Sequence, residues 1–306
     1  MSRITHYAVY LVIRIVVCIV QASRMETCHR FAKLLAFLAT DVFRIRAAVL
    51  EENLTCVFPE WSPKKRREVG RAMWEHLFLM GFEISHLQRK IHETNWRQHI
   101  HLHRKRELVT YLLDPRPIVI VSGHFGNFEM ASYTAGLLGI STVTAARPLK
   151  NDFLNRYINR IREAKGQFMV PTEGTAQMLQ DILKAGGRLA LVGDHFAGPK
   201  GCWVDFMGRP ASCHKALAIF TLSAGAPMVV CYAKRLAAPL QFEVGLKGVA
   251  DPDDLDESLY GVKPLTQWYN NELEQLVRAD PEQYWWIHRR WKGQPRQRRK
   301  PRQAAA

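Results

Sequence analysis

The stretch 117–130, which reads Pro-Ile-Val-Ile-Val-Ser-Gly-His-Phe-Gly-Asn-Phe-Glu-Met, contains the residues best suited to chemistry. The β-branched apolar run 118–121 predicts a short buried strand, and 127–138 is compatible with a helix. His124 is therefore expected in the turn that follows the strand, where an imidazole is accessible to a substrate.

His124 and Glu129 are five residues apart, which in a continuous helix would leave their side chains roughly 140° apart. They can meet only if His124 lies in the turn and Glu129 on the helix, and Gly123 and Gly126 permit such a turn. A carboxylate that accepts the Nδ1 proton leaves Nε2 free to take a proton from a hydroxyl. We therefore expect His124 to act as a general base oriented by Glu129. The alternative is a strand-end histidine bonded to a helix cap.

No protein nucleophile is indicated beside this base. Ser122 is two residues before His124, but the Gly-x-Ser-x-Gly elbow of serine hydrolases does not surround it. We therefore expect the hydroxyl of an acceptor molecule to be the nucleophile.

Strands and helices alternate after the first strand. Further strands are predicted at 142–145, 189–192, 228–233 and 240–244, and helices at 152–165 and 215–223. This order predicts an α/β fold with a mainly parallel sheet flanked by helices, and such sheets bind ligands at the carboxyl ends of their strands. Because His124, Arg147 and Asp194 all follow predicted strands, we expect them to share one site.

Two of these residues have alternative interpretations. Arg147 has the donor fork that binds a phosphate or an oxyanion, but it can also be an ordinary surface arginine. Asp194 and His195 can be imagined in a metal cluster with His124 and Glu129, but their spacing matches no standard zinc pattern. We therefore expect no metal. The six cysteines include no Cys-x-x-Cys pair, which is typical of free thiols in a reducing cytoplasm.

The chain is strongly basic, with 43 Lys and Arg against 28 Asp and Glu and a formal net charge of +15. This excess predicts a polyanionic partner: nucleic acid, an anionic membrane, or an acidic protein or phosphorylated lipid. The stretch 284–292 interleaves aromatic and basic residues, which suits stacked bases or a belt at a membrane interface. Alternatively, Arg289 or Arg290 buttresses the site.

The N-terminal part of the chain has helical periodicity. Residues 7–20 are apolar except for Arg14, and as a helix they would measure about 21 Å against a hydrocarbon core of about 30 Å. We expect this segment to lie in a membrane interface or to cross the membrane at a tilt; a buried helix and a secretory signal are the alternatives. Ser62 and Pro63 suit the cap and the first residue of a helix.

Two apolar stripes in the same region are expected to face the core. They consist of Phe31, Leu34, Leu35 and Leu38, and of Met73, Leu77, Met80 and Ile84. The chain then divides into four expected segments, which are a membrane-associated helix at 1–23, a helical region at 24–113, an α/β core at 114–292 and a disordered basic tail at 293–306.

Six motifs that span nearly the whole chain carry a family resemblance. They are 52–60, the His124 motif, 146–151 (Ala-Arg-Pro-Leu-Lys-Asn), 193–195 with Gly198 and Gly201, 204–210 and 281–292. In order and spacing they resemble the bacterial lipid A biosynthesis acyltransferases, the late lauroyl or myristoyl family. These enzymes are distant relatives of glycerolipid acyltransferases that share a His-x4-Asp/Glu motif.

The resemblance implies an O-acyltransferase at the cytoplasmic face of the bacterial inner membrane. Such an enzyme moves a fatty acyl chain from acyl carrier protein or coenzyme A to a hydroxyl of a lipid A precursor or a similar anionic glycolipid. It implies catalytic His124 and Glu129, and no cofactor beyond the acyl thioester co-substrate. Residues expected to contact substrate are Asn127, Arg147, Lys150, Asn151 and Asp194.

Two other functions stay open from the sequence. One is a related acyltransferase acting on a phosphatidylinositol mannoside or a lysophospholipid. The other is a non-catalytic basic protein that binds membrane or nucleic acid; the leading interpretation includes no nucleic-acid partner.

Overall fold

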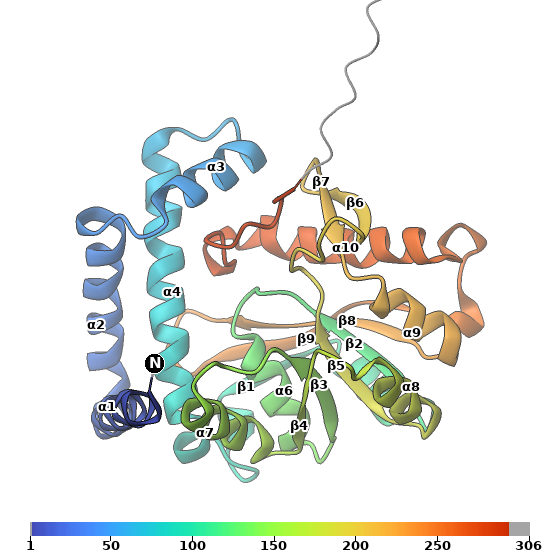
Figure 1. Ribbon diagram of the computed structural model, residues 1–306, viewed down its shortest axis with the longest axis horizontal. Coiled ribbons are helices and arrows are strands. Elements are labelled where there is room, and N and C mark those ends of the chain that lie inside the picture. The colour runs from blue at the N-terminus through green and yellow to red at the C-terminus, as the bar shows by residue number, and fades with distance from the viewer. Residues whose placement is uncertain (1, 294–306) are drawn as a thin grey trace, which may run out of the picture.

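A seven-stranded, mostly parallel sheet forms the centre of the computed structural model, which describes residues 2–293 (Figure 1). The strand order is β1-β9-β8-β2-β5-β3-β4, and β8 and β9 pair antiparallel. The strands of this sheet are β1 (Ile100–His103), β2 (Ile118–Ser122), β3 (Thr142–Ala146), β4 (Gln167–Pro171), β5 (Arg188–Val192), β8 (Met228–Arg235) and β9 (Phe242–Ala250). The expected fold class, an α/β fold with a mainly parallel sheet, is confirmed.

Helices cover both faces of the sheet and form a separate layer at one end. The α-helices are α1 (Arg3–Ala22), α2 (Met25–Phe37), α3 (Ala47–Val57), α4 (Pro63–Lys90), α5 (Lys105–Leu112), α6 (Phe128–Leu137), α7 (Asp152–Glu163), α8 (Ala176–Lys184), α9 (Ala216–Ala224) and α10 (Val262–Ala279). The shorter elements are the π-helix η1 (Leu38–Val42) and the 3₁₀ turns η2 (Trp96–Gln98), η3 (Pro252–Asp254), η4 (Glu257–Leu259) and η5 (Pro281–Gln283).

Strand β2 is central and buried on both faces. Ile118 and Ile120 pack with apolar residues of α5 and α6, whereas Val119 and Val121 pack with those of α8, α9 and α10. A continuous β-branched run is what a parallel strand covered on both faces requires, because successive side chains point to opposite faces. The burial of each such side chain contributes about 1.5–3 kcal/mol relative to exposure. The sheet is therefore a rigid base for the turn after β2.

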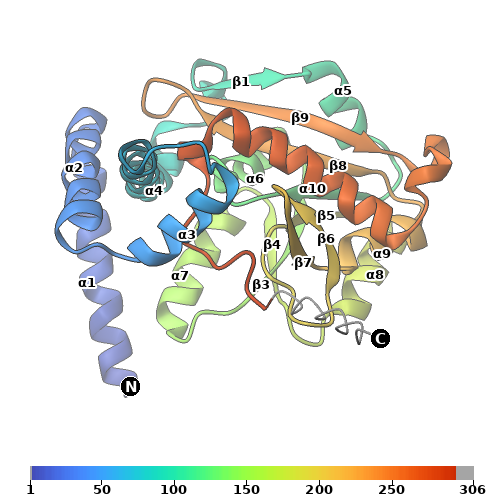
Figure 2. The same ribbon diagram turned by 90° about the horizontal axis from the view of Figure 1, so that it is seen from above.

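Helix α2 lies beside α4 at one end of the molecule (Figure 2). Ala32 and Ala36 are fully buried, which lets the two helix backbones approach closely. Phe31 and Leu34 are 51% and 50% exposed, so the expectation that their stripe faces the core was wrong. In the second stripe, Met73 is buried as expected.

The start of α4 is as the sequence predicts. Ser62 Oγ accepts a hydrogen bond from the backbone N–H of Lys65 at 3.2 Å, and Pro63 is the first helical residue. The cap satisfies one of the free N–H groups of the helix end.

Helix α1 has 20 residues, so it is about 30 Å long and exceeds the expected segment 7–20. None of its residues is buried, which rules out the alternative of a core helix. Its length and composition suffice to cross a membrane. One face packs on α7, where the Arg14 guanidinium lies 4.7 Å from the Tyr157 ring centroid. The opposite face is apolar and exposed.

Some elements were not predicted. Strand β1 lies within the stretch 24–113 that was expected to be helical, and it joins the sheet by pairing with β9. The motif 204–210 forms the turn of an antiparallel hairpin, β6 (Cys202–Phe206) and β7 (Arg209–Cys213), in which Gly208 N–H donates to Asp205 Oδ1. The expected basic tail lies outside the described residues from 294 onward.

Candidate active site

His124 and Asp194 meet at the carboxyl ends of the adjacent parallel strands β2 and β5. Ser122 is in register with Val192, so each strand brings its second following residue to the same edge of the sheet. Asp194 Oδ1 lies 2.7 Å from His124 Nδ1, and Asp194 Oδ2 accepts from the His124 backbone N–H at 2.8 Å. One buried carboxylate therefore fixes both the backbone and the ring of His124.

Asp194 is fully buried, yet the site favours its ionised form. Burial alone would raise the pKa of the carboxyl, but the charge and hydrogen bonds of His124 outweigh it and hold that pKa well below its usual range. An ionised Asp194 accepts the Nδ1 proton, so the neutral imidazole has its free lone pair on Nε2. Among residues 2–293, His124 Nε2 has no hydrogen-bond partner. The pair therefore has the arrangement of a general base and its orienting group.

Glu129 does not contact His124, so the expected hydrogen bond between them was wrong. Its carboxylate pairs with Arg162 of α7, whose Nε donates to the two carboxylate oxygens at 3.1 and 2.9 Å. Because α6 begins at Phe128, Glu129 lies in its first turn and is directed toward α7. A cavity of about 210 Å³ adjoins this ion pair. A catalytic role for Glu129 stays a prediction, but the structure gives the orienting position to Asp194.

Three rings from distant parts of the chain surround the His124 imidazole. His195 stacks on it with the ring centroids 4.0 Å apart and the planes at 19°, Trp285 lies at 4.9 Å and His288 at 5.9 Å. The backbone N–H of Trp285 donates to the His124 carbonyl at 3.1 Å. Together with Asp194 on one ring nitrogen, these neighbours leave the imidazole little room to rotate.

The C-terminal aromatic stretch therefore belongs to the interior beside the site. Trp286 and Arg290 are fully buried and Trp291 is 7% exposed, so the expectation of a membrane or nucleic-acid belt was wrong. Arg290 donates to the Ser212 carbonyl at 2.9 Å and to Asn270 Oδ1 at 3.0 Å. It buttresses the β7 end of the hairpin, in line with the alternative that the sequence left open.

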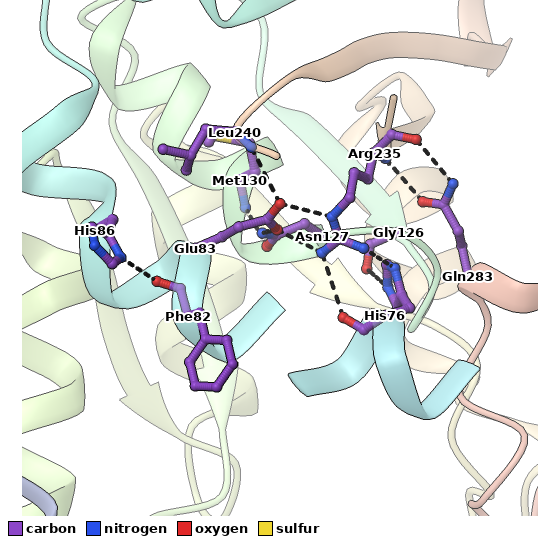
Figure 3. A network of polar contacts seen from close by, with 10 residues as sticks. All are labelled: His76, Phe82, Glu83, His86, Gly126, Asn127, Met130, Arg235, Leu240 and Gln283. Atoms are coloured by element: carbon purple, nitrogen blue, oxygen red, sulfur yellow. Dashed lines mark hydrogen bonds and ion pairs between the residues drawn. The ribbon is translucent and has the colours of Figure 1, made fainter. Parts of the chain in front are cut away.

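A buried polar network holds the turn that carries His124 (Figure 3). Glu83 of α4 accepts from Asn127 Nδ2 at 3.1 Å and from Arg235 Nε at 2.7 Å. His76, about two turns before Glu83 on α4, contacts the Gly126 carbonyl at 3.1 Å and also contacts Arg235. Helix α4 is therefore tied to the turn and to the end of β8 at once.

His76 acts in this network as a neutral imidazole. Burial and the charge of Arg235 hold its pKa well below the usual range. Nδ1 accordingly accepts from Arg235, and Nε2–H donates to the carbonyl of Gly126. Gly126 has φ +60°, and a Cβ there would lie 2.0 Å from the Ala233 carbonyl oxygen. The turn thus requires glycine at this position.

The other predicted substrate contacts divide into two groups. Arg147 and Lys150 are exposed; Arg147 directly follows β3, two strands from β2 and thus about 10 Å away across the sheet. Asn127 is fully buried and caps α6 while it bonds Glu83, which contradicts the expected substrate contact. Asn151 caps α7 and donates to the His6 carbonyl at 2.8 Å, so it links α7 to α1.

Sequence matching identifies the family. Residues 1–293 match the family described as bacterial lipid A biosynthesis acyltransferase. The chain belongs to this family. The lipid A biosynthesis lauroyltransferase of Escherichia coli (strain K12) is 25% identical over 269 residues, which make up 84% of this chain and 83% of that protein. The resemblance carried by the six motifs is thus confirmed, and the protein is an acyltransferase by family.

Several residues of this acyltransferase site were missed or misassigned. Asp194 was expected to contact substrate, and Arg162 and His288 were not singled out. The sequence signal for Asp194 was its place directly after a strand, at Gly193-Asp194. The signal for His288 was its place directly after the apolar run 284–287.

The acyltransferase should lose stability as the pH falls from about 6.5 toward 4. Burial is the main cause that lowers the pKa of His288 to about 4; Asp194 opposes this, and His124 and His195 add to it. The unfolded chain keeps an ordinary histidine pKa of about 6.5, so between these values it binds more protons than the folded protein. The contribution of a neutral His288 to the free energy of unfolding is therefore complete above pH 6.5, and it is lost as the pH falls from 6.5 to 4. Urea unfolding at several pH values measures it.

A matched pair of variants tests whether His288 causes this pH dependence of stability. His288→Gln should make the free energy of unfolding depend less steeply on pH between 4 and 6.5. His101→Gln, in an exposed histidine of β1, should keep the wild-type slope. An unchanged slope in His288→Gln would show that His288 is not held neutral.

Proposed function

We propose that this acyltransferase moves a fatty acyl chain from an acyl thioester, carried by acyl carrier protein or coenzyme A, to a hydroxyl of a lipid A precursor. The observation that carries the proposal is the buried Asp194 carboxylate on His124 Nδ1 at the strand ends, which leaves Nε2 as the base. Family membership supports the reaction class, and the E. coli relative supports lipid A biosynthesis as the setting.

The reaction proceeds by direct attack. His124 Nε2 removes the proton of the acceptor hydroxyl as its oxygen attacks the thioester carbonyl carbon. The tetrahedral intermediate then expels the thiolate, which takes the proton back from the imidazolium. The products are the acyl ester and the free thiol, and no protein side chain is acylated. Asp194 stabilises the imidazolium and holds the ring throughout, as an orienting aspartate does in a catalytic triad.

Charge develops on the thioester oxygen during the attack. Helix α6 begins at Phe128, four residues after His124, and its free N–H groups and positive end favour a negative charge near them. The exposed Arg147 at the end of β3 is a further candidate for an anionic substrate group. The net charge of +15 suits both an acidic carrier protein and a phosphorylated glycolipid.

The proposed location is the cytoplasmic face of the inner membrane. Helix α1 supports it, because the helix is about 30 Å long, is apolar enough to cross a membrane and has no buried residue. The six cysteines are free, as a reducing compartment requires.

Mass spectrometry of lipids tests the function directly. We expect lipid A from a strain with the gene to carry one more acyl group than lipid A from a deletion strain. Complementation with His124→Ala should not restore the mass. A shift on a lysophospholipid or a phosphatidylinositol mannoside would assign another acceptor. Salt-sensitive duplex binding with no turnover of acyl donors would contradict the enzyme function itself.

A further inference from the structure

The 42–46 loop, which consists of the last residue of η1 and the four residues that connect it to α3, presents apolar side chains to solvent although its backbone is ordered. Phe43 is 68% exposed, and Val42 and Ile45 are 52% and 43% exposed. The backbone N–H of Phe43 donates to Leu38 O and that of Ile45 to Ala39 O, both at 2.8 Å. The loop is thus fixed in a conformation that keeps an aromatic ring in water, which is unfavourable unless a partner covers it.

Arginines alternate with these apolar residues. Arg44 and Arg46 are exposed and have φ of +48° and +53°, a left-handed conformation that costs a non-glycine residue about 1–3 kcal/mol. Among residues 2–293, Arg44 forms no ion pair. Strain at Arg44 and Arg46, combined with the exposed ring of Phe43, indicates a loop shaped for binding.

Further apolar side chains are exposed on α1 and α2. Figures 1 and 2 both place α1 and α2 at the same end of the molecule. The outward residues of α2 include Phe31, Leu34 and Phe37, with Arg30 and Lys33 exposed among them. Helix α1 also exposes large apolar residues, among them Ile4, Val12, Ile15 and Ile19. Apolar side chains with interspersed cations match a bilayer interface, where rings enter the acyl boundary and cations meet phosphates.

This loop is bonded directly to the segment that flanks His124. Arg46 Nη1 donates to the Ile287 carbonyl at 3.1 Å. Asn53, in the helix that follows the loop, donates to the carbonyls of Trp286 and His288 at 2.7 and 3.1 Å. A surface that holds the loop therefore also positions the chain beside the active-site imidazole.

We propose that the 42–46 loop and the outer face of α2 dock on an anionic lipid bilayer, as a membrane contact separate from α1, and thereby place the His124 site at the headgroups. The inference goes beyond the proposed function and depends on it only for the acceptor being a membrane lipid. The partner is a bilayer rather than an acidic protein, because the exposed apolar side chains outnumber the cations in the loop.

Vesicle binding of the full-length chain tests the docking. Phe43→Asp should lower the partition coefficient onto phosphatidylglycerol vesicles about tenfold, since it replaces the ring that would enter the bilayer with a charge. Tyr260→Asp is the matched control, because Tyr260 is also 68% exposed and lies at the end of η4, away from the 42–46 loop in sequence. It should bind like the wild type. Arg44→Asn, which tolerates the left-handed backbone, should weaken binding to phosphatidylglycerol but not to phosphatidylcholine.

Hydrogen exchange on the vesicle-bound wild type provides a second measurement. It reports on the loop itself, so it stays informative even if α1 dominates the partitioning of the whole chain. Amides at 38–47 should gain protection on phosphatidylglycerol vesicles, and those at 255–262 should not. Wild-type partitioning of Phe43→Asp together with unchanged exchange at 38–47 would overturn the proposal. Conversion of a dimer to a monomer by Phe43→Asp, with partitioning unchanged, would make the patch a self-association surface and would also overturn it.

Activity separates this inference from the proposed function. Phe43→Asp should slow transfer to an acceptor embedded in vesicles at least tenfold and leave transfer to a detergent-dispersed acceptor within a few-fold of wild type. If the wild type transfers no acyl chain to lipid A but shows the expected vesicle binding, the proposed function fails and the docking stands. An equal loss in both assays would mean that the loop acts on the fold, not on the membrane.

Discussion

Asp194→Asn should slow acyl transfer by about 10²–10⁴-fold, because the amide removes the negative charge beside the imidazolium and selects the wrong tautomer of His124. In the wild type, the carboxylate accepts both from Nδ1 and from the backbone N–H of His124. An asparagine side chain has only one oxygen to accept these two hydrogen bonds. If that oxygen accepts from the backbone N–H of His124, the NH₂ group faces Nδ1 and cannot accept its proton. The measurement is the turnover rate with an acyl thioester and a detergent-dispersed acceptor, with a thermal melt to confirm folding.

Glu129→Gln is the matched control for this substitution. Both changes turn a carboxylate into an amide, but Glu129 pairs with Arg162 and does not touch His124. Asp194→Asn should therefore have little further effect on the rate once His124 is removed, whereas any effect of Glu129→Gln should persist in the His124→Ala background. If only the effect of Glu129→Gln disappeared in that background, Glu129 would be the orienting group, as the sequence spacing suggested.

His124→Ala should reduce transfer by at least 10²–10⁴-fold, the range that a positioned general base contributes. The protein should remain folded, because the side chain lies in a turn at the strand end and the apolar clusters on both faces of the sheet do not include it. Initial rates with a labelled acyl donor measure the loss.

Ser122→Ala provides the control for a covalent mechanism. Ser122 ends β2 two residues before His124 and should be dispensable, with activity within a few-fold of wild type. Trapping of an acyl group on Ser122, together with an inactive alanine variant, would contradict direct attack by the acceptor.

The sequence was sufficient to find the strand ends but not the order of the strands. Burial on both faces makes β2 and β5 readable as short apolar runs, so His124 and Asp194 could both be placed after strands. Their contact depends on β5 being the direct neighbour of β2, and strand order is set by long-range packing, which local pattern does not encode. The nearer carboxylate in sequence, Glu129, was therefore chosen for a role that Asp194 fills.

Large apolar residues were a poor guide to the buried face of α2. The structure buries Ala32 and Ala36 and exposes Phe31 and Leu34, because close helix packing needs small side chains and the large ones face outward. In a protein expected to meet a membrane, an apolar stripe fits either the core or the lipid. The small residues Ala32 and Ala36, on another face of the same helix, were the signal that shows which face packs on α4. The C-terminal aromatics were misassigned for the related reason that tryptophan and arginine suit an interface and an interior alike.

The central claim is that His124 and Asp194 act as one unit in a direct transfer, and a double-variant cycle tests it most directly. Rates are compared for the wild type, His124→Ala, Asp194→Asn and the double variant in one assay. Without His124 there is no ring for Asp194 to orient, so we predict that the double variant has a transfer rate within a few-fold of that of His124→Ala. A double variant slower than His124→Ala by the full factor of Asp194→Asn would show that the two residues act independently, and would contradict the mechanism.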